Sequence, residues 1–146
     1  MSALEDVDRL IERFRLSMDG FLKGDPEPTK KSVFSHRDDV TLANPYGPPA
    51  RGWDEVAKVT EYAASQVRDG EMTGYETVAK CVTPELAYVV WIERPKAKVG
   101  GSEEITPFAL RVTMIFRPEE EGEWKVVHRH ADPITTPQPA ESVIQE

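Results

Sequence analysis

Apolar residues recur at steps of three and four positions near the start of the chain. This spacing places them on one face of an amphipathic helix, with acidic and basic residues on the opposite face. It predicts a helix over residues 4–23, which Gly24 ends, and Asp25-Pro26 favours a second short helix through about Ser35. The apolar face of the first helix consists of Leu4, Val7, Leu10, Ile11, Phe14, Met18, Phe21 and Leu22.

A proline-rich stretch separates these helices from a third one. Residues 40–43 favour a short strand, and the next ten residues, NPYGPPARGW, contain three prolines and two glycines. Such a composition predicts a rigid irregular loop over residues 44–53. Helical spacing resumes at Trp53, and we expect Gly70 to end this helix after Arg68 and Asp69.

From residue 72 onward the apolar pattern changes to the alternation that is typical of strands. Four strands are predicted, over residues 72–83, 86–94, 105–117 and 124–132, with turns at Pro84-Glu85, Gly100-Gly101 and 119–122. Helices followed by antiparallel strands predict an α+β fold, with the helices on one face of a curved sheet. We expect one domain over residues 1–133 and a proline-containing, loosely attached or disordered tail over residues 134–146.

Both faces of the predicted sheet carry apolar side chains. In strand 105–117 one face is apolar throughout, while the other mixes Ala109, Arg111, Thr113, Ile115 and Arg117. Three helices cover only one face, so we expect a second subunit to cover the other and predict a homodimer through the outer sheet face. The apolar face of this strand is formed by Phe108, Leu110, Val112, Met114 and Phe116.

Composition excludes several classes of function. The net charge of −8, from 26 acidic and 18 basic residues, opposes binding to nucleic acid or to an anionic membrane, and no run of lysine or arginine offsets it. No segment has the apolar length to span a membrane, and the N-terminus lacks the pattern of a secretory signal. Cys81 is the single cysteine, which excludes an intramolecular disulfide and agrees with a cytoplasmic location.

The stretch VVHRHAD near the end of the last strand holds the candidate catalytic or metal-binding histidines. His128 and His130 share one face of the strand at a spacing of about 7 Å, and Asp132 follows them on that face. Three ligands along one extended strand do not converge on one tetrahedral ion, so we expect no metal site and no cofactor. A histidine general base stays an alternative to a structural histidine at a subunit contact.

Two segments carry a resemblance to a known family. The segments DDVTLANPYGPPARGWDEV and LRVTMIFRPEEEGEWKVVHRHAD resemble the SnoaL-like, ketosteroid-isomerase-like branch of the nuclear-transport-factor-two-like superfamily, over residues 5–133. The resemblance implies a cystatin-like, cone-shaped α+β roll, with about three N-terminal helices packed on a strongly bent antiparallel sheet. It also implies a pocket between helices and sheet, and dimerisation through the outer sheet face.

The ketosteroid isomerases of this superfamily use an acidic base and two hydrogen-bond donors, and this chain departs from all three. The base position matches Asn44, the first-helix tyrosine matches Ser17, and the strand acid falls near Met114. An amide cannot abstract a proton, so steroid isomerisation by that mechanism is not expected.

The end of the last strand is also similar to the association domain of calcium/calmodulin-dependent protein kinase II, in which arginines line the pocket. The corresponding face here carries Arg111, Thr113, Arg129 and Ala131. The similarity implies that Arg111 and Arg129 point into the cone beside Trp91 and Glu93, whereas both histidines face the subunit contact. The alternative is that both arginines are solvent-facing strand residues.

Taken with the resemblance, these residues predict a protein that binds a small organic molecule, with an anionic and aromatic ligand as one option. Isomerase, dehydratase or cyclase-type catalysis is an option for its activity. The alternative is a non-catalytic oligomerisation or ligand-binding module similar to a kinase association domain. The expected pocket residues are Asn44, Tyr46 and Trp53 at the mouth, with Trp91, Glu93, Arg111, Thr113 and Arg129 inside, although Trp53 fits simple core packing equally well.

Overall fold

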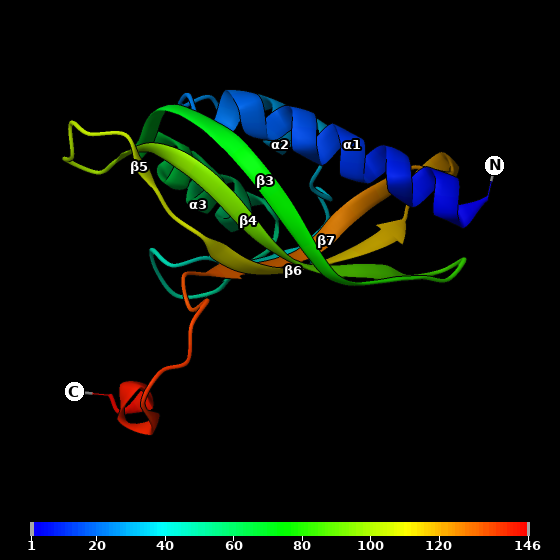
Figure 1. The fold of residues 1–146 in the computed structure, drawn as a ribbon. Coiled ribbons are helices and arrows are strands. Elements are labelled where there is room, and N and C mark those ends of the chain that lie inside the picture. The colour runs from blue at the N-terminus through cyan, green and yellow to red at the C-terminus, as the bar shows by residue number, and fades with distance from the viewer. Residues whose placement is uncertain (1, 146) are drawn as a thin grey trace.

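A computed structural model describes residues 2–145 and shows three helices on the concave side of one curved sheet (Figure 1). The helices are α1 (Ala3–Phe21), α2 (Glu27–Ser32) and α3 (Trp53–Ser65). The strand order is β2-β1-β7-β6-β4-β3, with β5 paired to β4. The strands are β1 (Thr41–Ala43), β2 (Ala50–Arg51), β3 (Val67–Val82), β4 (Ala87–Val99), β5 (Thr106–Pro107), β6 (Leu110–Pro118) and β7 (Trp124–Asp132).

This architecture confirms the predicted α+β roll, with one difference in the sheet. Strand β1 pairs with β7 in parallel, so the sheet is mixed and not wholly antiparallel. The helix predicted over residues 4–23 is confirmed as α1, which ends at Phe21. Ser2 caps its start in a reciprocal capping box with Glu5. The face of α1 that packs into the core carries Val7, Leu10, Ile11, Phe14 and Met18.

Gly70 does not end α3, contrary to the prediction. The helix ends at Ser65 and β3 begins at Val67, so Gly70 lies within a strand. A Cβ atom at this position would lie 2.6 Å from both the Ala97 Cβ and the Lys96 carbonyl oxygen. The glycine is therefore needed for the close approach of β4, a contact between distant residues that the local sequence does not reveal.

A bulge in β7 decides which side chains enter the core. Ile115 of β6 pairs with His128, but the next residue, Phe116, pairs with Val126, so Val127 is an extra residue. An inserted residue reverses the alternation of the strand on either side of it. Val126 before the bulge and Arg129 after it therefore both face the helices, while His128 faces away.

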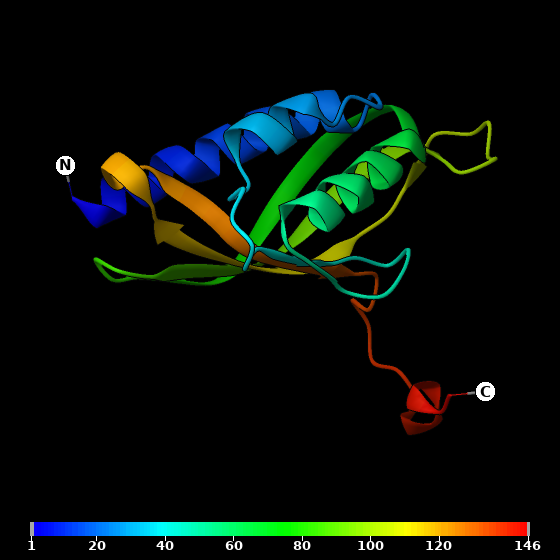
Figure 2. The same ribbon diagram turned by 180° about the vertical axis from the view of Figure 1, so that it is seen from behind.

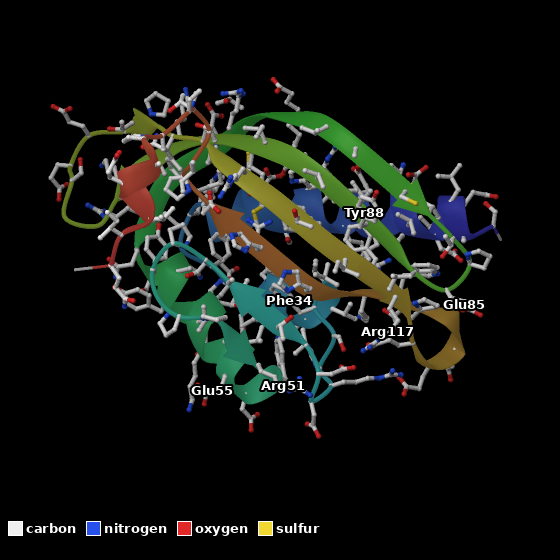
Figure 3. All side chains as sticks on the ribbon, turned by 90° about the horizontal axis from the view of Figure 1, so that it is seen from below. Phe34, Arg51, Glu55, Glu85, Tyr88 and Arg117 are labelled. Atoms are coloured by element: carbon white, nitrogen blue, oxygen red, sulfur yellow. The ribbon has the colours of Figure 1, made fainter. Side chains whose placement is uncertain are left out.

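Among residues 2–145 no α-helix covers the convex side of the sheet, here called the outer face (Figures 1 and 3). Tyr88 lies on this face and is exposed. Of its partners across the strands, Cys81 is exposed and Ile115 is half-buried. The centre of the outer face is mainly apolar, formed by Tyr88, Val90, Ile92 and Ile115. No helix in the described part of the chain is long and apolar enough to cross a membrane.

After β7 the chain leaves the body of the domain as an extended segment, here called the C-terminal arm (residues 133–145). Every residue of the arm is exposed. In both side views it descends on the side of the sheet opposite the helices and ends in a short 3-10 turn, Ala140–Val143 (Figures 1 and 2).

The close approach at Gly70 leads to a stability prediction. Gly70→Ala forces a methyl group against the Lys96 backbone and should lower the free energy of unfolding by about 2 kcal/mol, which corresponds to a fall in melting temperature of roughly 5 °C. Gly74→Ala in the same strand is the control, because no atom lies within 4 Å of its Cβ position. Thermal unfolding followed by circular dichroism measures both, and equal melting temperatures for the two variants would show this explanation of Gly70 to be wrong.

Candidate functional site

The interior of the cone contains a buried ion pair between β4 and β7. The Nη2 and Nη1 groups of Arg129 donate to the two carboxylate oxygens of Glu93 at 2.8 and 2.9 Å. The indole Nε1 of Trp91 donates to the same carboxylate at 3.0 Å. The side chains of Arg129 and Glu93 are 13% and 2% exposed, so the pair is almost wholly removed from water.

Both charges are compensated at this depth. Burial disfavours the charged guanidinium, but the adjacent Glu93 carboxylate outweighs this effect, and the pKa of Arg129 lies above its ordinary value. The guanidinium carbon also lies 5.2 Å from the centre of the Phe14 ring, within the range of a cation–π contact. Arg129 is therefore a permanent cation held in a fixed position inside an apolar core.

The ion pair borders a cavity enclosed by the three helices and the inner face of the sheet, here called the cone cavity. Its volume is about 90 Å³, whereas an engineered apolar cavity of about 150 Å³ takes up benzene. A ligand with one six-membered ring therefore already extends into the mouth. The apolar walls include Phe14, Met18, Phe21, Leu22, Phe34, Leu42, Ala63, Val67, Met72, Pro95, Phe108, Leu110 and Ala131.

A few polar groups besides the ion pair reach the cavity. The Thr29 hydroxyl donates to the Ser17 hydroxyl and the Thr60 hydroxyl donates to the Val56 carbonyl. Because both protons are used, each threonine oxygen can only accept a hydrogen bond from a ligand. Asn44 and Tyr46 also line the cavity, at the predicted loop.

The structure thus brings four of the predicted pocket residues to the cavity: Asn44, Tyr46, Glu93 and Arg129. Trp91 does not line it, because its ring packs against Phe14 and Tyr75 behind the ion pair. Trp53 also lies outside the lining, since it stacks on the His36 ring at 3.9 Å. Trp91 therefore holds Glu93 in place, and Trp53 is a packing residue.

The prediction that Arg111 and Thr113 face the cone is wrong. Both lie on the outer face, because they alternate with the buried residues Val112 and Met114 along β6. Arg111 Nε donates to the Asp132 carboxylate at 2.7 Å on that side of the sheet. The resemblance implied one face for both arginines. Along the chain from β6 to β7 the extra residue Val127 lies between them and shifts the register, so Arg129 pairs with Met114 on the inner face and Arg111 pairs with Asp132 on the outer face.

His128 and His130 also lie on the outer face, which removes them as general bases for a ligand in the cavity. His128 Nδ1 shares a hydrogen bond with the Thr41 hydroxyl at 2.8 Å, and His130 Nε2 contacts Asp132 at the same distance. Burial and then the neighbouring His130 lower the pKa of His128. Among residues 2–145 no three metal-binding side chains gather in one place.

Some residues that shape the cavity were not predicted. Thr60 shares the buried face of α3 with Val56, Ala63 and Ala64. A hydroxyl among apolar residues at helical spacing is a signal that the sequence offers. Thr29 has no such signal, because α2 is short and its buried side is set by packing against α1.

Comparison with known proteins agrees with this architecture. The SnoaL-like domain family matches residues 30–135, and no curated protein matches the chain. A nuclear transport factor 2 superfamily protein of Salmonella enterica is 17% identical with a TM-score of 0.75, and each chain is covered over 94%. A proposed dehydratase of Streptomyces avermitilis is 21% identical with a TM-score of 0.69, over 90% of this chain and 96% of that one.

A third structure is a proposed calcium/calmodulin-dependent protein kinase type II association domain of Thiobacillus denitrificans. It is 19% identical with a TM-score of 0.66, over 88% of this chain and 94% of that one. At these identities the three structures establish the shared fold alone. Because the family match spans most of the chain and confirms the resemblance in the two quoted segments, the protein belongs to the SnoaL-like domain family.

Proposed function

We propose that the protein binds a small, neutral, mostly apolar organic molecule in the cone cavity, with the Glu93–Arg129 pair as its polar anchor. The observation that carries this proposal is a buried ion pair in the wall of a mostly apolar cavity. A buried pair rarely stabilises a fold more than apolar packing of the same volume does. Its position at a cavity is therefore better explained by ligand recognition than by stability.

The charges of the site favour a neutral ligand over the anionic one considered from the sequence. That option relied on two arginines in the cone, but Arg111 lies on the outer face and Glu93 neutralises Arg129. The carboxylate uses two N–H groups of Arg129, and a guanidinium has further N–H groups to offer. A ligand carbonyl oxygen can accept one of these, whereas a ligand carboxylate meets the negative charge of Glu93.

Isomerase or dehydratase chemistry is a second candidate, and Glu93 would then be its base. Glu93 is the one carboxylate among the cavity-lining residues in the described chain. Arg129 would stabilise negative charge that develops on a substrate oxygen. Three N–H donors already occupy the Glu93 carboxylate, so we place binding ahead of catalysis.

The proposed partner at the outer face is a second copy of the chain, as in a binding and assembly module. The mainly apolar centre of that face, with Tyr88 exposed, suits burial against an identical surface. The fold that the chain shares with a proposed kinase association domain supports this proposal of self-association.

Three probes with one ring test the ligand class. Cyclohexanone should bind more tightly than methylcyclohexane and at least about tenfold more tightly than cyclohexanecarboxylate, since only the ketone offers a neutral acceptor to Arg129. Chemical-shift titration by NMR measures all three affinities. The double substitution Glu93→Leu with Arg129→Met should remove the preference for the ketone, and Arg111→Met on the outer face is the matched control. Tightest binding of the carboxylate would overturn the proposal.

A charge at the centre of the outer face tests self-association. Ile115→Asp should weaken dimer formation by at least about 100-fold, because burial of an unpaired carboxylate costs several kcal/mol. Light scattering after size-exclusion chromatography gives the mass at micromolar concentration. Leu16→Asp, at an exposed apolar position of α1, should leave the dimer intact. A wild-type chain that runs as a monomer would exclude the proposed pairing.

A further inference from the structure

We propose that the C-terminal arm of one copy docks in a surface groove of a second copy, beside the mouth of the cone cavity. The groove, here called the tyrosine groove, lies between the loop at residues 44–51 and α3. Its walls include Tyr46, Pro48, Pro49, Arg51, Lys58 and Tyr62.

The arm has the properties of a segment that needs a partner. Val143 and Ile144 are 85% and 67% exposed, and apolar side chains of this size are stabilised by burial. The backbone hydrogen bonds that begin in the 3-10 turn stay within it, from Ser142 to Pro139 and from Ile144 to Glu141. The arm is thus an exposed, mostly extended segment whose apolar end is not covered by its own domain.

The tyrosine groove has the complementary chemistry. Tyr46 and Tyr62 are 45% and 54% exposed, and their rings meet edge to face with centroids 6.1 Å apart. Exposed aromatic rings beside prolines form the type of groove that binds polyproline II segments. The arm contains Pro137 and Pro139, and Pro139 has the polyproline II angles φ −65° and ψ 149°.

The charges agree with the same pairing. Within residues 2–145, Arg51 of the groove has no ion-pair partner, and Lys58 pairs with Glu55 on the same helix. The groove therefore carries one positive charge in excess. Glu141 is the charged residue of the arm, so the arm brings a negative charge to a positive groove.

The direction and length of the arm favour a second copy over its own domain. The arm leaves on the outer-face side of the sheet (Figures 1 and 2), which is where the proposed pairing places the second copy, and the inference rests on that pairing. At full extension the thirteen residues of the arm would reach at most roughly 40 Å, which is comparable to the diameter of a domain of this length. The arm can therefore reach around the edge of a partner.

Docking at this position would link assembly to the ligand site. Asn44 and Tyr46 line both the cone cavity and the tyrosine groove, so a docked arm lies against the loop that forms the cavity mouth. Each copy would then complete the mouth of the other, which gives the paired chains a more enclosed ligand site than a single chain has.

Disulfide trapping in the full chain tests the contact. In a Cys81→Ser background, which removes the native exposed thiol, Val143→Cys on the arm is combined with Glu55→Cys at the groove (Figure 3). Mild oxidation should give a disulfide-linked dimer on a non-reducing gel. Val143→Cys alone, and Val143→Cys with Leu16→Cys on the distant helix α1, should give at least about tenfold less.

A second substitution tests whether the arm binds in the tyrosine groove or only passes near it. Tyr62 does not line the cone cavity, and Tyr62→Ala should lower the cross-link yield about tenfold, as expected when a buried aromatic contact is lost. An unchanged yield would overturn the assignment of the groove, and an intramolecular cross-link would show that the arm docks on its own chain. A dimer by light scattering without cross-linking would reject the arm but keep the outer-face pairing, whereas a monomer would reject both.

Discussion

The buried pair of Glu93 and Arg129 is the interaction on which the interior of this protein depends. Either charge alone would be strongly unfavourable in the apolar cone, so each requires the other. The pairing in turn requires that β4 and β7, which are not neighbours in the sheet, present these residues at matching heights on the inner face. Trp91 and Phe14 then pack around the pair and keep water from it.

Sequence periodicity predicted the elements of the fold but not the details that place the site. The apolar spacing of α1 and the alternation in β6 could be interpreted directly, because each depends on residues close in sequence. The extra residue Val127 leaves no local signal, yet it decides that Arg129 enters the cone while Arg111 stays outside. Gly70 is a similar case, since its reason lies in the neighbouring strand. The sequence predicted the strands, but the register in which they pair decides which side chains enter the cone, and local patterns do not contain that register.

The two faces of the sheet carry side chains suited to different kinds of binding. Its inner face holds one neutralised ion pair in an apolar cavity, which suits recognition of a neutral molecule. Its outer face carries the histidines, Arg111 and an apolar centre, which suits contact with another chain. The loop at residues 44–51 contributes to both the cavity mouth and the tyrosine groove. In the proposed assembly this one segment therefore takes part in ligand binding and in contact between the copies.

A double-mutant cycle on the ion pair tests the central claim most directly. The free energy of unfolding is measured by urea denaturation for Glu93→Leu, Arg129→Met and the combination of the two. If the charges are buried and mutually dependent, each single substitution lowers stability by about 3–5 kcal/mol, because it leaves an unpaired charge in the core. The double variant then lies within about 1–2 kcal/mol of the wild type. Losses that simply add in the double variant would contradict the account.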